Sequence, residues 1–202
     1  VEEVSLTLGK NAFAYCGMLS KVTLPARLAN YDPTQNVFEK CVNLTDINIT
    51  SSGNGYSSID GVIVKKDGTD VELVYCPAAK SGTYTVPNEV TKIAQNAFNG
   101  CNKITKLELG RRVTLIDTGA FNGCTRLSEI VFNDDALENL TIEKDAFSGC
   151  TMLTEVTLNA TIGTVRTGAF GGTTAIQTLQ VNCGPDTVIE DGAFTKAVNV
   201  VF

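Results

Sequence analysis

Glu129 and Glu155 stand at the same place in two similar stretches of the chain, LSEIVF and LTEVTL. Two carboxylates at a defined separation are the groups that hydrolyse a glycosidic bond. On adjacent strands these side chains would lie about 5 Å apart, which is the spacing between neighbouring strands. An open polar face would not provide the pocket that gives two carboxyl groups different pKa values. We therefore expect no enzyme, and a parallel β-helix-like carbohydrate-active enzyme is the less favoured alternative.

Seven cysteines are the other residues with reactive side chains, and the chain contains no histidine. Ser-His and Cys-His catalysis and histidine-containing metal sites therefore cannot be built from this chain alone. No CxxC spacing occurs, so we expect no zinc site and no cofactor.

Five cysteines recur at one position of a repeat, which favours a buried column of small apolar thiols over a disulfide framework. Disulfide geometry would only just permit bonds between neighbouring cysteines of this column. These five are Cys16, Cys41, Cys101, Cys124 and Cys150, whereas Cys76 and Cys183 fall outside the column.

Composition describes a folded protein of 202 residues, with 43% apolar and 19% charged residues. The net charge of -6, without a run of Lys or Arg, argues against binding to nucleic acid or to an anionic membrane. No window is apolar enough to cross a bilayer, and no signal peptide is visible in a sequence that begins at Val1. We therefore expect no direct membrane insertion by this segment.

A repeat of about 24 residues organises the chain. Copies of the motif AFxGC place phenylalanines at intervals of 25, 60, 23, 26, 23 and 24 residues, which are Phe13, Phe38, Phe98, Phe121, Phe147, Phe170 and Phe194. Such regular spacing is typical of a solenoid, in which each repeat buries its apolar face on its neighbours. The phenylalanines are therefore predicted to form a core column.

The spacing of apolar residues within one repeat predicts its local structure. Steps of three over AFxxCxxL change to steps of two, as in Ile130 and Phe132, which indicates a short helical turn that continues into a strand. A second apolar pair precedes most phenylalanines and predicts another strand. Examples of this pair lie at 90–93, 113–116, 162–165 and 188–189.

The long interval between Phe38 and Phe98 contains an insert at about 51–88. Its apolar runs 62–66 and 71–75 flank Asp67-Gly68, a dipeptide that favours a hairpin turn. We predict a β-hairpin that stands on the edge of the solenoid, with Pro77 ending its second strand. Both a structural elaboration and a contact loop are consistent with this insert.

Outward residues of the predicted strands form two columns, which we call the strand face. In a curved array these columns would make one continuous face, and solenoids use such faces for partners. The face lacks Trp, Tyr, Phe and Arg, which normally dominate tight interfaces, so it favours weak, multivalent contact or an ordinary solvated sheet. The strand face consists of Lys21, Thr23, Asp46, Asn48, Lys106, Glu108, Glu129, Val131, Glu155, Thr157, Thr178 and Gln180.

The consensus AFxGCxxLxxIxL, preceded by VTxIxxxAF, resembles the BspA-like class of leucine-rich repeats from bacterial surface proteins. The segment Tyr56 to Phe98 is similar to a block that commonly interrupts these arrays. The resemblance covers nearly the whole chain, although Thr173 and Ala197 replace the repeat cysteine. It implies one domain, 1–202, of about seven repeats, the last one partial. The implied fold is an α/β repeat solenoid, a right-handed β-α superhelix that is strand-rich with short helical turns and an inserted β-hairpin.

The same resemblance implies a noncatalytic, extracellular or cell-surface module of the adhesion type, with any signal or anchor outside this sequence. Its partner would be a protein or glycan of host or bacterial origin, and the module itself would be a monomer. A structural spacer that presents other domains is the alternative. Composition and spacing alone do not separate these two functions.

Overall fold

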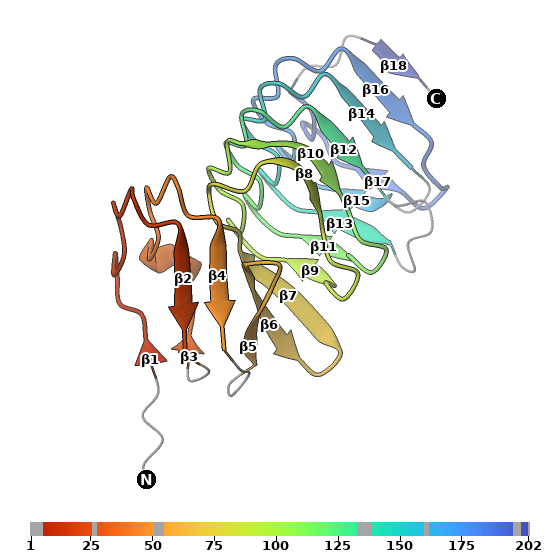
Figure 1. Cartoon of the computed structure of the whole chain (residues 1–202). Helices are drawn as coiled ribbons and strands as arrows, with labels where there is room; N and C mark the ends of the chain where they lie inside the picture. Colours follow the sequence, from red (N-terminus) through yellow and green to blue (C-terminus); the bar gives the residue numbers. More distant parts are fainter. Residues whose placement is uncertain are drawn as a thin grey trace.

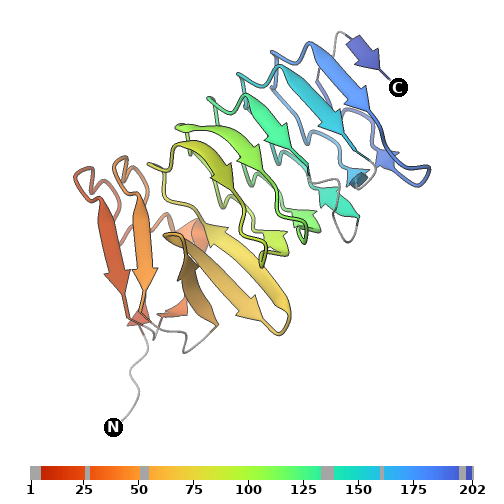
Figure 2. The same ribbon diagram turned by 45° about the vertical axis from the view of Figure 1, so that its right-hand side comes forward.

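Each repeat folds into one coil of a solenoid, and a coil consists of a strand, a tight turn that carries the repeat phenylalanine, and a second strand (Figure 1). The computed structural model describes residues 6–25, 28–50, 55–132, 139–159, 162–195 and 199–201. Successive coils stack so that equivalent strands lie side by side and the two ends of the chain lie at opposite ends of the stack (Figure 2).

The strands that follow the turns form three parallel sheets along one side of the solenoid. Strand pairs keep equivalent residues in register, as in Lys106 opposite Glu129 and Glu155 opposite Thr178. The three sheets contain, in order, β2 (Lys21–Leu24) and β4 (Asp46–Ile49); β8 (Gly82–Thr85), β10 (Ile104–Glu108) and β12 (Glu129–Val131); and β14 (Glu155–Leu158), β16 (Thr178–Val181) and β18 (Asn199–Val201).

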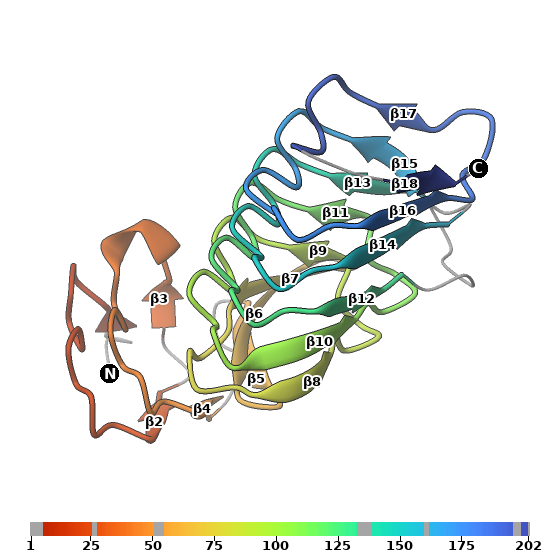
Figure 3. The same cartoon turned by 90° about the horizontal axis from the view of Figure 1, so that it is seen from above.

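The strands that precede the turns form the opposite layer, mainly one eight-stranded sheet that we call the second sheet (Figure 3). The apolar pairs predicted as strands are confirmed as β9, β11, β15 and β17. The second sheet contains β5 (Tyr56–Ile59), β6 (Val62–Asp67), β7 (Asp70–Tyr75), β9 (Lys92–Ile93), β11 (Leu115–Ile116), β13 (Leu140–Ile142), β15 (Ile162–Val165) and β17 (Val188–Ile189). A separate pair is made by β1 (Leu6–Thr7) and β3 (Leu28–Asn30), and a 3-10 turn, η1, spans Pro33–Gln35.

The predicted helical turn, and with it the helical half of the β-α superhelix, is wrong: the AFxxC segments are tight turns. Asn96 and Gly100, two residues before and after Phe98, both have positive φ, which interrupts a right-handed helix. The Phe98 N–H donates to Ala120 O in the next coil at 2.7 Å instead of to a carbonyl four residues earlier. The same two positions have positive φ in other coils, at Asn11, Tyr15, Asn36, Lys40, Gly119, Gly123, Asp145, Gly149, Gly168 and Gly172.

The predicted phenylalanine column is confirmed as the centre of the core. Phe121 and Phe147 stack with centroids 5.1 Å apart and are essentially inaccessible to solvent. Phe13 and Phe194, at the two ends of the stack, are only partly buried. The rings stack from Phe13 to Phe38 and from Phe98 to Phe194, while Tyr75 packs on Phe38 and Tyr84 on Phe98 at the insert. This stacking explains why the motif recurs with so little change outside the insert.

The predicted hairpin is confirmed as the antiparallel pair of β6 and β7, and with β5 it forms one end of the second sheet. β7 pairs in parallel with β9 and thereby continues the second sheet, while β5 adds a third antiparallel strand. After β7, Cys76 takes the phenylalanine position, because its N–H donates to Ala97 O at 2.8 Å as Phe98 does to Ala120. The chain then forms β8, so the insert contributes a coil of its own.

Candidate binding surface

The strand face points away from the core, as predicted. Eight of its twelve residues are exposed and four are half-buried, whereas the residues between them in β4, β10, β12 and β14, such as Ile47, Leu107 and Val156, are buried. This alternation follows from the two-residue period of a strand, which sends successive side chains to opposite sides.

The expected continuous face is divided into three parts, because β4 does not pair with β8 and β12 does not pair with β14 among the described residues. Two pairs of strand-face positions were also missed. Thr83 and Thr85 in β8 continue the two columns beside Lys106 and Glu108. Asn199 and Val201 in β18 continue them beside Thr178 and Gln180. The alternation in Gly-Thr-Tyr-Thr-Val, 82–86, is a signal that could have revealed β8.

Charged side chains at the centre of the strand face neutralise each other. Lys106 Nζ lies 3.3 Å from a carboxylate oxygen of Glu108 and 2.9 Å from one of Glu129. The Thr85 hydroxyl donates to Glu108 at 2.9 Å. The hydrogen bond to Glu129, followed by the one to Glu108, raises the pKa of Lys106, and the bond from Thr85, followed by the one from Lys106, lowers the pKa of Glu108.

A similar arrangement surrounds Asp46 in β4. Lys21 Nζ lies 3.9 Å from one carboxylate oxygen, and Lys80 Nζ lies 3.8 Å from the other. The Thr45 hydroxyl also donates to Asp46 at 2.7 Å. Lys80 lies in the insert, so its ion pair with Asp46 joins the insert to the second coil, and Lys80 also donates to the Asp60 carbonyl oxygen within the insert. These polar groups stabilise the joint between coils.

Between Val131 at the end of β12 and Thr157 in β14, the strand face makes fewer contacts with the rest of the chain. Glu155 and Thr157 are exposed and form no ion pair or side-chain hydrogen bond with any described residue. Val131 is also exposed, at 38% of its surface. This part of the face therefore offers one carboxylate, one hydroxyl and one apolar side chain to solvent.

Glu129 and Glu155, the two carboxylates with catalytic spacing in the sequence, lie on strands of different sheets. Glu129 is instead in an ion pair with Lys106. Within the described ranges, no group of three or more His, Cys, Asp or Glu side chains could hold a metal ion. The acidic residues at 133–138, which follow β12, lie outside the described residues.

The predicted thiol column is confirmed for four of its five members, which are buried: Cys41, Cys101, Cys124 and Cys150. Cys16 is exposed because it belongs to the first described coil, where no earlier coil covers it. All seven cysteines are free thiols. The column is consequently a structural feature of the core.

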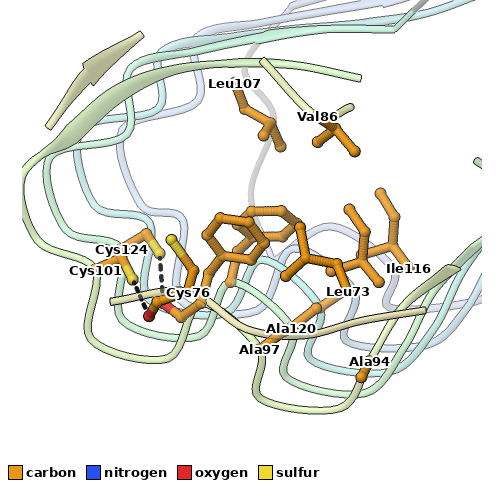
Figure 4. Close-up of a cluster of buried hydrophobic side chains, with 14 of the residues drawn as sticks. Leu73, Cys76, Val86, Ala94, Ala97, Cys101, Leu107, Ile116, Ala120 and Cys124 are labelled. Atoms are coloured by element: carbon orange, nitrogen blue, oxygen red, sulfur yellow. Dashed lines mark hydrogen bonds between the residues drawn. The ribbon is translucent and has the colours of Figure 1, made fainter. Parts of the chain in front are cut away.

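Each of the four buried thiols of the column donates to a backbone oxygen of the preceding coil, and Figure 4 shows this for Cys101 and Cys124. Cys124 donates to Phe98 O at 3.2 Å, and Cys150 donates to Phe121 O at 3.4 Å. Cys101 donates to Cys76 O at 3.5 Å, which again places Cys76 at the phenylalanine position. Burial raises the pKa of Cys124 well above its ordinary value and raises that of Cys150 to about 12. These thiols therefore stay protonated and unreactive near neutral pH.

The second sheet carries an ion-pair ladder that the sequence reasoning missed. Arg166 lies between Glu143 and Glu190 of the neighbouring coils, with nitrogen to oxygen distances of 3.7 Å and 2.6 Å. The hydrogen bond to Glu190 raises the pKa of Arg166, and the same bond, followed by one from the Thr167 N–H, lowers the pKa of Glu190. All three side chains are solvent-accessible, so we interpret the ladder as coil-to-coil stabilisation.

The stacked coils, the phenylalanine column and the polar strand face define a leucine-rich-repeat solenoid. The sequence matches the family described as BspA type leucine rich repeat region, in six copies over residues 2–60 and 75–201. The chain belongs to this family. The resemblance inferred from the motif AFxGC is thereby confirmed.

Solved structures show the same fold at low sequence identity. A leucine-rich cell surface protein from Faecalibacterium prausnitzii has a TM-score of 0.68 and 22% identity, covering 94% of this chain and 58% of that protein. The pneumococcal vaccine antigen PcpA has a TM-score of 0.60 and 22% identity, covering 87% and 48%. A leucine-rich repeat protein from Eubacterium ventriosum has a TM-score of 0.55 and 21% identity, covering 89% and 59%.

The chain thus spans about half to three fifths of the length of these solved structures. Comparison with curated proteins gives no significant match. Over the ranges that the structure describes, no helix is long and apolar enough to cross a membrane. Membership of this leucine-rich-repeat family suggests a protein-interaction module.

Proposed function

We propose that this chain is a noncatalytic interaction module of the adhesion type, located outside the cell or on its surface, which binds a protein or glycan through the strand face. The observation that carries the proposal is the exposure of Val131, Glu155 and Thr157 without side-chain partners among the described residues. Membership of a family with surface-protein neighbours supports the location. Weak, multivalent binding follows from the polar character of the face.

The test is binding of the immobilised chain to a panel of matrix proteins, plasma proteins and polysaccharides. Saturable binding to at least one member is the expected result. The absence of binding to every member of a broad panel would contradict the proposal.

A structural spacer is the second candidate, and the mutual neutralisation of Lys106, Glu108 and Glu129 favours it, since paired charges contribute little to a partner. A spacer tolerates replacement by an unrelated rod of equal length in the intact parent protein, whereas a binding module does not. If cells or particles that carry the intact parent protein still bind their target after such a replacement, the result would support the spacer.

A further inference from the structure

Strand β8 has an unpaired edge in the interior of the solenoid. It is the terminal strand of the sheet that it forms with β10 and β12, and no described strand pairs with its other side. The Gly82 N–H donates to Lys103 O at 3.0 Å, and the Val86 N–H donates to Glu108 O at 2.8 Å, so both point toward β10. Because residues of a parallel strand direct their backbone groups to alternate sides, those of Thr83 and Thr85 point to the free edge.

The edge lacks a partner strand among the described residues because the insert binds β4, the strand that would otherwise pair with it. In a regular array β4 of the preceding coil would pair with β8. Instead, the Ile47 N–H donates to Gly61 O at 3.0 Å, and the Ile49 N–H donates to the Ser58 hydroxyl at 3.0 Å. The N–H groups of Ile47 and Ile49 in β4 therefore already donate to the insert. Within the described chain no backbone hydrogen bond joins Thr83 or Thr85 to β4.

A second observation also points to a missing partner at this place. Tyr84, between the two threonines, is 92% buried, and its hydroxyl has no hydrogen-bond partner in the described part of the chain. Its side chain packs edge-on against Phe98, with ring centroids 5.1 Å apart. A buried hydroxyl without a partner loses its hydrogen bonds to water and gains none in return, so a ligand that supplies a partner would gain affinity.

We propose that the free edge of β8 accepts an extended peptide segment of a protein partner, which adds to the sheet as a further strand. Its backbone would pair with the N–H and C=O groups of Thr83 and Thr85, as in other interactions by strand addition. Its outward side chains would lie beside the exposed threonines and favour small polar residues. One inward side chain would approach Tyr84 and favour a hydrogen-bonding group. A peptide fits this edge better than a glycan because only a polypeptide repeats donors and acceptors at strand spacing.

The probe is a synthetic peptide with the sequence of Asn43–Thr50, which contains β4 and has the pattern of the strand that a regular array would place here. Amide hydrogen exchange of the whole chain is measured with and without this peptide. In the free chain we expect the Thr83 and Thr85 amides to exchange faster than those of Gly82 and Tyr84. The peptide should slow them by about tenfold, which corresponds to about 1.4 kcal/mol, whereas a scrambled peptide of equal composition should not.

The matched variants are Thr85→Pro and Thr85→Ser. Proline removes the backbone N–H that faces away from β10, together with the hydroxyl that donates to Glu108. Backbone pairing with β10 is retained while the edge is blocked. Thr85→Pro should abolish the effect of the peptide, and Thr85→Ser should retain it. If Thr85→Pro does not fold, the wild-type chain with a peptide N-methylated along its backbone serves the same purpose and should show no protection.

Protection of Thr83 and Thr85 in the free chain equal to that of Tyr84 would overturn the proposal, as would a peptide effect that persists with Thr85→Pro or with N-methylation. The inference rests on the proposed function, because both require a macromolecular partner. The two proposals can fail independently. If Thr85→Pro binds the panel ligand as the wild type does, the chain is still an interaction module, but the β8 edge is not its binding site.

Discussion

The Cys124 thiol donates a hydrogen bond to the backbone oxygen of Phe98 in the preceding coil, over 3.2 Å. The same relationship recurs between Cys150 and Phe121 and between Cys41 and Phe13. The repeat cysteine therefore joins coils as well as filling space. In the coil of Phe170, Thr173 stands at the cysteine position and its hydroxyl donates to Phe170 O of its own coil.

Replacing Cys124 tests the contribution of this bond. Cys124→Ala removes both the donor and the volume of a buried sulfur, so we expect the free energy of unfolding to fall by about 1–2 kcal/mol. Cys124→Ser keeps a donor of similar size and should cost less than alanine. Urea unfolding of the two variants measures the difference, and a serine variant less stable than alanine would contradict a role for the donor.

Truncating a stacked ring tests the phenylalanine column. Phe147 is fully buried between Phe121 and Phe170, so Phe147→Ala should cost about 3–5 kcal/mol. Phe194→Ala, at the partly buried end of the stack, should cost less. Met152→Ala is the control, because Met152 is exposed and its loss should change stability by no more than about 0.5 kcal/mol. Thermal unfolding measures the stability of each variant. If Phe147→Ala were about as stable as Met152→Ala, the result would contradict the stacked core.

The turn geometry predicts losses of stability of different size at different glycines. Gly123 has φ of 70° with open space around it, so Gly123→Ala should cost about 1–2 kcal/mol through backbone strain alone. Gly119→Ala should cost more, because the new Cβ would lie 2.6 Å from Asn96 Oδ1. Gly17 lacks positive φ and is equally unobstructed, so Gly17→Ala should stay within about 0.5 kcal/mol. Chemical unfolding of the three variants gives the ranking, and equal losses at Gly17 and Gly123 would refute it.

The buried thiols predict a loss of stability in alkali. Burial raises the pKa of Cys150 from 9.0 to about 12, so the unfolded chain releases this proton at lower pH than the folded chain does. Between these values the folded state binds more protons, and the free energy of unfolding therefore falls as pH rises, by at most about 1.4 kcal/mol per pH unit for one thiol.

Urea unfolding from pH 8 to 11 measures this slope. Cys150→Ala should make the slope shallower, whereas Met152→Ala, which removes an exposed side chain without a titratable proton, should leave it unchanged. Equal slopes in the wild type and in Cys150→Ala would contradict the assignment.

Periodicity alone predicted the features that every coil repeats. The phenylalanine ring, the buried cysteines and the outward strand positions are dictated by contacts that each coil makes with identical neighbours. The turn was predicted as helical because AFxxCxxL has apolar residues at helical spacing. Asn96 and Gly100 at fixed distances from Phe98 are residue types that tolerate positive φ, and they could have indicated the turn.

The coil formed by the insert could not be found by repetition. Cys76 stands where other coils have phenylalanine, and Tyr84 packs against Phe98 from β8. Cys76 and Tyr84 fill the core through contacts that occur only in this coil. The repeat pattern of the other coils therefore does not predict them. The division of the strand face at β4 and β8 follows from the same irregularity.

Charge reversal on the strand face tests the central claim most directly. The measurement is binding of the double variant Glu129→Lys, Glu155→Lys to the ligand found with the wild-type panel. The control is Asp186→Lys, Asp191→Lys, which makes the same charge change at two exposed residues beside the second sheet. We predict that the strand-face variant loses at least about tenfold in affinity while the control binds as the wild type does. Unchanged binding of the strand-face variant, or an equal loss in both variants, would contradict the strand face as the binding site.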